Sequence, residues 1–175
     1  PVFTVGASTT ALYYVSFKLV RNEEGNITKQ FFTAFCSNFK KATLIWLPLL
    51  GLGILFGIDG YVLYHIRLEN VFWTLCGAVL ICAGVVYLIV LLNIFPLFAR
   101  FENTIPATFK NALVMGLRYL FCSILMAVVY FVIYYVIINI FTPFVVFGQG
   151  LGALICSWLI LPILERLENN KDDVL

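Results

Sequence analysis

The sequence predicts an all-α fold, namely a polytopic helical membrane protein in a single domain that takes up residues 1–175. Composition is the first indication, because 62% of the residues are hydrophobic and only 11% are charged. A soluble domain with so few charged side chains could not cover its surface with polar groups. The second indication is that the apolar residues gather in four stretches. Each of these is long enough to cross a bilayer core of roughly 30 Å as a helix.

The four stretches are residues 42–66, 71–99, 113–141 and 143–164. Hydrocarbon offers no hydrogen-bond partners, so segments that face it satisfy their backbone amides internally as helices. Residues 1–20 are a weaker fifth candidate, because their apolar run covers only residues 11–20 and follows Gly6, Ser8, Thr9 and Thr10. This segment is either a full span or a short or re-entrant helix. We therefore expect about five transmembrane helices in this chain.

Two polar segments between the spans are predicted to be amphipathic elbow helices at the membrane surface, at residues 28–41 and 100–112. At ~100° per residue, the aromatic residues of the first elbow fall within about 140° of one another, and its lysines cover the opposite face. The aromatic face comprises Phe31, Phe32, Phe35 and Phe39 together with Cys36, and the lysines are Lys29, Lys40 and Lys41. A helix of this kind is built to lie at the headgroup boundary, where anionic lipid attracts its basic residues.

The distribution of lysine and arginine predicts which loops are cytoplasmic. If the predicted spans alternate in direction, one side of the membrane receives ten basic residues and the other side receives only Arg67. The ten are Lys18, Arg21, Lys29, Lys40, Lys41, Arg100, Lys110, Arg118, Arg166 and Lys171. Basic residues are enriched in cytoplasmic loops. Both elbows and a tail at residues 165–175, including the C-terminus, are therefore expected in the cytoplasm of a multi-pass cell-membrane protein.

The residues that usually carry chemistry do not form a reactive pattern. The five cysteines lie within apolar segments and show none of the spacings of a metal site, so we interpret them as packing residues. His65 is the only histidine, and no nucleophile and carboxylate are spaced around it as a triad requires. Asp59 is expected near the outer interface rather than at mid-bilayer. The sequence thus predicts no enzyme, no cofactor, no metal site and no nucleic-acid partner.

Two pairs of glycines predict places where another helix can approach closely. Gly53 and Gly57 stand four residues apart, as do Gly148 and Gly152. Small residues at this spacing leave a shallow groove on a membrane helix. The sequence leaves open whether the helix that fills each groove belongs to this chain or to a partner.

Several motifs together resemble one family. They are residues 1–14 (PVFTVGASTTALYY), Arg21-Asn22-Glu23-Glu24-Gly25, Phe31-Phe32, Phe35, Asn38-Phe39, Arg100-Phe101-Glu102-Asn103 and Lys110-Asn111-Ala112. Over nearly the whole chain, the sequence resembles the YesL family of small bacterial integral membrane proteins, a family of unknown function. Members usually carry a further hydrophobic helix ahead of the Pro-x-x-Thr-x-Gly block. The resemblance therefore implies six spans in the intact protein, with the first one missing here.

The resemblance also implies a context, because members are typical of Gram-positive bacteria and are often encoded beside importers for oligosaccharides. The family offers no established catalytic residues to carry over. The expected function is a non-catalytic accessory subunit that packs against the permease subunits of a carbohydrate ABC importer and stabilises or regulates it. Contact with the cytoplasmic ATPase is a further expectation. The candidate partner contacts are Phe31, Phe35, Arg100, Glu102 and Lys110 at the elbows, with Gly148 and Gly152 in the bilayer.

Two other functions stay open at this point. The chain could be an autonomous transporter or channel for a small uncharged solute, with a path lined by polar residues of the spans. Those residues are Ser8, Thr9, Thr10, Asn93, Asn139 and Gln149. A hydrated path along them would favour transport, whereas a closely packed bundle would not. A purely structural role in the bilayer is the other alternative.

Overall fold

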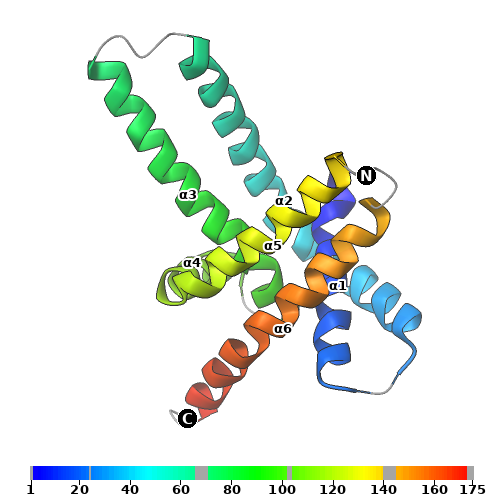
Figure 1. Ribbon diagram of the computed structural model, residues 1–175. Coiled ribbons are helices and arrows are strands. Elements are labelled where there is room, and N and C mark those ends of the chain that lie inside the picture. Colours follow the sequence, from blue (N-terminus) through cyan, green and yellow to red (C-terminus); the bar gives the residue numbers. More distant parts are fainter. Residues whose placement is uncertain (1, 24, 66–70, 102–103, 140–144, 173–175) are drawn as a thin grey trace.

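A computed structural model describes residues 2–23, 25–65, 71–101, 104–139 and 145–172, and within these ranges every regular element is helical (Figure 1). The elements are a short 3₁₀ helix η1 (Val2–Thr4) and the α-helices α1 (Val5–Val20), α2 (Ile27–His65), α3 (Val71–Arg100), α4 (Ile105–Arg118), α5 (Leu120–Asn139) and α6 (Val145–Asp172). The predicted all-α fold is confirmed.

Four of these helices are long and apolar enough to cross a membrane: α2, α3, α5 and the segment Phe147–Glu168 of α6. They correspond to the four apolar stretches of the sequence, and they are compatible with a multi-pass membrane protein. Their apolar side chains are largely uncovered. Only 11% of the most apolar window of α3 and 17% of that of α2 are buried within the chain. In water such apolar surfaces would associate, whereas in hydrocarbon their exposure costs no free energy.

The weak fifth candidate, residues 1–20, forms the centre of the bundle. Helix α1 has 16 residues, which corresponds to about 24 Å at ~1.5 Å per residue, and it is not one of the four candidate spans. It contacts α2, α3 and α6. Its polar side chains are accommodated inside the protein, as when the hydroxyl of buried Thr10 donates to the Gly6 carbonyl at 2.8 Å. This explains how an element too polar to face lipid can lie among membrane helices.

Small residues on α1 bring its backbone close to α2. A Cβ atom added at Gly6 would lie 2.7 Å from the Cβ of Trp46 and 2.8 Å from the carbonyl oxygen of Ala42. The next residue of α1, Ala7, has no exposed surface, and on α2 Ala42 and Ile45 have none. The two helices therefore meet through a glycine that no larger residue could replace without moving one of them.

The structure corrects the prediction for the two elbows. The first elbow, residues 28–41, is not a separate helix but the first part of the continuous α2, which passes through Pro48. The second elbow helix is α4, so it lies at residues 105–118 rather than 100–112, and the following span begins at Leu120 rather than at residue 113. The consecutive apolar residues 113–117 were assigned to the following span, but they belong to the end of α4. Tyr119, with φ −117° and ψ 48°, separates the two helices.

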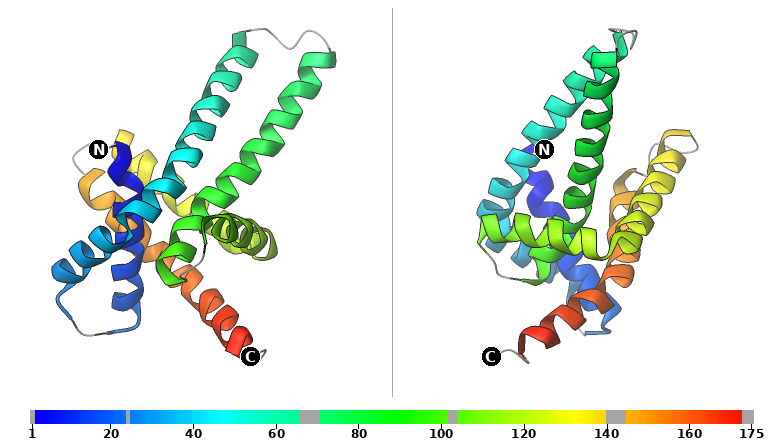
Figure 2. Two further views of the ribbon diagram at one scale, coloured as in Figure 1. Left: turned by 180° about the vertical axis from the view of Figure 1, so that it is seen from behind. Right: turned by 90° about the vertical axis from the view of Figure 1, so that its left-hand side faces the viewer.

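Helices α2 and α3 form a hairpin that extends well away from α5 and α6 (Figures 1 and 2). At its base, the Tyr87 hydroxyl donates to the Leu49 carbonyl at 3.0 Å, and the rings of Phe56 and Tyr87 pack with centroids 5.4 Å apart. Beyond this point most of the described side chains of both helices are exposed. At the other end of the chain, α6 continues past residue 165, where the predicted tail begins, as far as Asp172.

The close approach at Gly6 gives a testable prediction. Replacing Gly6→Ala should lower the free energy of unfolding by about 1–3 kcal/mol, because the added methyl group meets the α2 backbone. Thermal unfolding in mild detergent measures the change. Gly57→Ala is the matched control, since a Cβ there would meet nothing within 4 Å, and it should leave stability equal or slightly higher. Equal melting temperatures for the two variants would contradict the packing described here.

Candidate functional site

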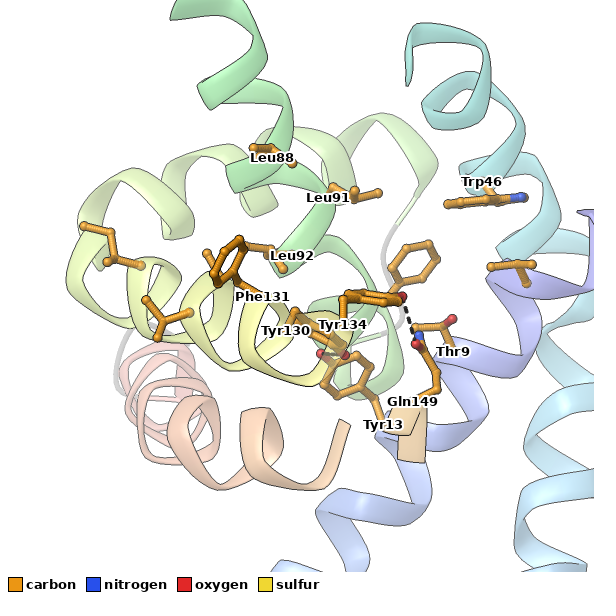
Figure 3. A pocket seen from close by; sticks show the side chains of 15 residues that line it. Thr9, Tyr13, Trp46, Leu88, Leu91, Leu92, Tyr130, Phe131, Tyr134 and Gln149 are labelled. Atoms are coloured by element: carbon orange, nitrogen blue, oxygen red, sulfur yellow. Dashed lines mark hydrogen bonds between the residues drawn. The ribbon is translucent and has the colours of Figure 1, made fainter. Parts of the chain in front are cut away.

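A partly open cavity of about 650 Å³ lies between α1, α2, α3, α5 and α6 (Figure 3). Its walls are mainly aliphatic and aromatic. The described lining residues are Val5, Thr9, Tyr13, Trp46, Leu88, Leu91, Leu92, Phe95, Ile124, Ala127, Val128, Tyr130, Phe131, Tyr134 and Gln149. Leu88 on α3 and Ile124 and Phe131 on α5 are strongly exposed, so the cavity is open beside α3 and α5.

Three tyrosines and a glutamine place hydrogen-bonded polar groups in the wall of this cavity. The hydroxyls of Tyr13 on α1 and Tyr130 on α5 lie 3.0 Å apart in a hydrogen bond, and Tyr13 is 2% exposed. One turn further along α5, the Tyr134 hydroxyl donates to Oε1 of Gln149 at 3.3 Å. The rings of Tyr130 and Tyr134 are stacked with centroids 6.4 Å apart. This tyrosine row links α1, α5 and α6 across the cavity (Figure 3).

The chemistry of the cavity is that of a binding surface. None of the described residues that line it carries a charge. Its hydroxyl and amide groups can hold a polar atom at one side of an apolar molecule, which is the usual composition of a ligand pocket. In the described part of the chain, no three His, Cys, Asp or Glu side chains come together as metal ligands would.

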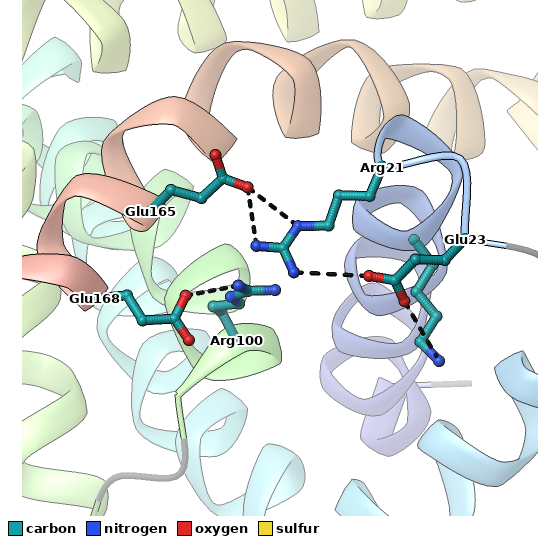
Figure 4. A network of polar contacts seen from close by, with 6 residues as sticks. Arg21, Glu23, Arg100, Glu165 and Glu168 are labelled. Carbon is teal, nitrogen blue, oxygen red and sulfur yellow. Dashed lines mark hydrogen bonds and ion pairs between the residues drawn. The ribbon is translucent and has the colours of Figure 1, made fainter. Parts of the chain in front are cut away.

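A second polar feature, here called the clasp, joins the ends of α1, α3 and α6 (Figure 4). The Arg21 guanidinium donates from Nε and Nη2 to Oε1 of Glu165, at 3.1 and 2.8 Å. Arg100 at the end of α3 donates to Oε2 of Glu168 at 2.6 Å. Glu23 lies within ion-pair distance of Arg21, at 3.6 Å. Since α1 ends at Val20, the clasp places the ends of these three helices on one side of the bundle.

The predicted partner-contact residues differ in their burial and in their contacts within the chain. Phe31 and Phe35 are half-buried on α2 with their rings stacked 6.3 Å apart, and Lys110 is exposed on α4. Arg100 is engaged with Glu168 inside the chain. Glu102 lies outside the described residues.

Gly148 and Gly152 are covered by α5 of the same chain. A Cβ at Gly148 would lie 2.8 Å from Cδ1 of Ile137, and one at Gly152 would lie 2.9 Å from the Tyr130 ring. The helix that fills this glycine groove is therefore an internal one. By contrast, Gly57 of the other predicted pair is open, while a Cβ at Gly53 would meet the Tyr87 hydroxyl at 2.7 Å.

The six residues of the alternative solute path do not all line this cavity. Only Thr9 and Gln149 line the cavity. The buried amide of Asn93 donates to the Ile89 carbonyl and to the Ser123 hydroxyl, both at 2.8 Å. Ser8, Thr10 and Asn139 donate to carbonyls of their own helices.

Sequence reasoning missed the tyrosine row and the acidic half of the clasp. Glu165 and Glu168 stand three residues apart at the end of an apolar helix, so they share one face. They are acidic residues on the side of the membrane that is predicted to hold ten of the basic residues. This placement of opposite charges is the signal that could have revealed the ion pairs. The tyrosines gave no comparable signal, because aromatic residues are common throughout this sequence.

Comparison with known families bears on the first part of the chain. Residues 1–60 match the family described as "Protein of unknown function, DUF624". The match covers η1, α1 and α2 as far as Gly60, and thus the glycine contact between α1 and α2. The comparisons with curated proteins and with solved structures found no match. The family description carries no activity, so function has to be argued from the chain itself.

The clasp can be measured by a double-mutant cycle. Arg21→Gln and Glu165→Gln should each lower stability, and their coupling should be about 0.5–1 kcal/mol, because both side chains are partly exposed and screened by water. Unfolding in detergent at low salt gives the coupling, which should shrink as ionic strength rises. Lys41→Gln serves as the control at an exposed lysine. Strictly additive effects of the two substitutions would contradict a stabilising ion pair between Arg21 and Glu165.

Proposed function

We propose that this protein is a non-catalytic membrane subunit that packs against a carbohydrate ABC importer and stabilises or regulates it. The motifs that resemble the YesL family support this assignment, together with the bacterial, Gram-positive context that the resemblance implies. The match of residues 1–60 to a family of unknown function is compatible with it. The uncharged, largely apolar cavity gives no support to a catalytic role.

The observation that carries the proposal is an uncovered small-residue face on α2. Leu49, Gly53, Gly57 and Gly60 follow one another at spacings of four, four and three residues, so they lie along one face of the helix. The first part of this face is used within the chain, since Leu49 is 1% exposed and Gly53 meets Tyr87. At Gly57 and Gly60 the same face continues, but an added Cβ would meet nothing within 4 Å.

A transmembrane helix of a partner is the occupant that such a face suits. In a bilayer, helices associate through small residues because these let two backbones come close and gain van der Waals contact. Gly84 on α3, the other arm of the hairpin, is open in the same way. Permease subunits consist of membrane helices and supply this kind of partner. At the elbows, Phe31, Phe35 and Lys110 are the proposed contacts for the permease or its ATPase, and Arg100 contributes through its pair with Glu168.

Recovery of the permease with the tagged protein tests this proposal. Purification in mild detergent should retain permease subunits, and Gly57→Leu with Gly60→Leu should reduce their recovery at least about tenfold by filling the small-residue face. Gly51→Leu is the matched control, because Gly51 is equally open but lies on the opposite side of α2 from Gly60. Wild-type protein that recovers no permease, or equal losses in all variants, would count against the proposal.

For the topology, we propose that the clasp, both elbows and the C-terminus are cytoplasmic. The clasp supports a common side for the ends of α1, α3 and α6, and the ten basic residues of that side favour the cytoplasm. A fluorescent protein fused to the C-terminus should therefore fluoresce, while alkaline phosphatase at the same place should be inactive. Phosphatase inserted near Arg67 should be active, and the reverse pattern would contradict this orientation.

An autonomous transporter for a small uncharged solute is the second candidate function. The observation that favours it is the cavity, where Thr9 and Gln149 offer polar atoms beside the tyrosine row. Sugar flux into liposomes that contain this protein alone distinguishes the two candidates, because an accessory subunit by itself should give none.

A further inference from the structure

The basic residues of the clasp and of the two elbow helices fall into two groups with different surroundings. Arg21 and Arg100 are partly buried and paired with Glu165 and Glu168. In contrast, Lys29 and the other cations of the two elbow helices are exposed, and they lie within 4 Å of no carboxylate in the described part of the chain. The second group comprises Lys29, Lys40 and Lys41 on α2 and Lys110 and Arg118 on α4.

On α2 these cations flank an exposed aromatic stripe. Phe32 and Phe39 are 59% and 38% exposed, and at ~100° per residue they lie about 20° apart around the helix. Lys29 and Lys40, eleven residues apart, also lie about 20° from each other and about 60–100° from that stripe. The inner face of the same segment is buried at Ala34. The outer surface of this part of α2 therefore combines phenylalanine rings with lysines.

Helix α4 also combines exposed cations with exposed apolar side chains, which here are aliphatic. Lys110, Val114 and Arg118 follow at intervals of four residues along its outer face, and Val114 is 54% exposed. Thr108 and Met115 on the other side of the helix are buried. Helix α4 also contacts α2. The first part of α2 follows the end of α1 in the sequence, and α4 follows the end of α3. The clasp holds these two helix ends on the same side of the bundle.

We infer that the first part of α2 and α4 together form a binding surface for anionic phospholipid, with the exposed apolar side chains in the acyl layer and the cations at the headgroups of one leaflet. Charge complementarity selects this occupant: the cations have no described acidic partner, and anionic headgroups supply one. The mixture of exposed rings and lysines on neighbouring faces suits a boundary that is apolar on one side and negatively charged on the other. This surface is separate from the small-residue face of the outer hairpin, and it shares Lys110 with the elbow contacts proposed above.

Lipid retention tests the inference. The full chain is reconstituted in vesicles of equimolar phosphatidylglycerol and phosphatidylcholine, purified in zwitterionic detergent, and its bound lipid is quantified by mass spectrometry. Each exposed cation near an anionic surface strengthens binding by about fivefold, so phosphatidylglycerol should be enriched at least about tenfold. Lys29→Gln, Lys40→Gln, Lys110→Gln and Arg118→Gln combined should bring the ratio close to one.

The matched control keeps the charge by substituting Lys29→Arg, Lys40→Arg and Lys110→Arg, and it should retain the enrichment. Melting temperatures in zwitterionic detergent should be the same for all three proteins, since the changed side chains are exposed. Equal retention of the two lipids by the wild type, or unchanged enrichment in the glutamine variant, would overturn the inference. So would a glutamine variant that loses permease recovery without any change in bound lipid, because the surface would then serve a protein partner.

Discussion

The burial of α1 is the constraint on which the other features depend. This helix is too short and too polar to face hydrocarbon along its length, yet Thr10 and Tyr13 are almost completely buried. It is stable there because its hydroxyls find acceptors and because α2, α3 and α6 surround it. Gly6 sets how closely α2 can approach. A side chain that separated these two helices would expose polar groups that lipid cannot satisfy.

The cavity and the clasp both take their geometry from α1. Tyr13, in the middle of the helix, meets Tyr130 and so fixes one wall of the cavity relative to α5. Arg21, directly after the helix ends, reaches Glu165 on α6. The chain then reverses at Asn22, whose φ of 54° lies in the left-handed region that asparagine tolerates better than most residues. One buried helix thus positions a polar row within the bundle and an ion pair at its end.

The sequence predicted those parts of the fold that depend on local composition. The lengths of the apolar stretches predicted four spans, and the structure has a long apolar helix at each of them. The parts that depend on tertiary packing were not predictable in the same way. Residues 113–117 look like the start of a span, but they form the last part of α4, a separate helix that ends at Arg118. Gly148 and Gly152 have a small-residue pattern whatever helix covers them, and only the fold shows that it is α5. The clasp joins residues 144 positions apart in the sequence.

The surfaces that the fold leaves uncovered differ in chemistry, and this difference separates what they can bind. Gly57 and Gly60 offer an uncharged surface of exposed backbone. Such a surface favours the close approach of an apolar helix and makes few contacts with lipid chains. The elbow surface around Lys40 and Phe39 offers charge beside exposed rings, which a transmembrane helix could not match without burying the lysine. The two surfaces lie in different halves of the same continuous helix, α2. A protein held to the headgroups by one half of α2 would present the other half to its partner at a fixed depth.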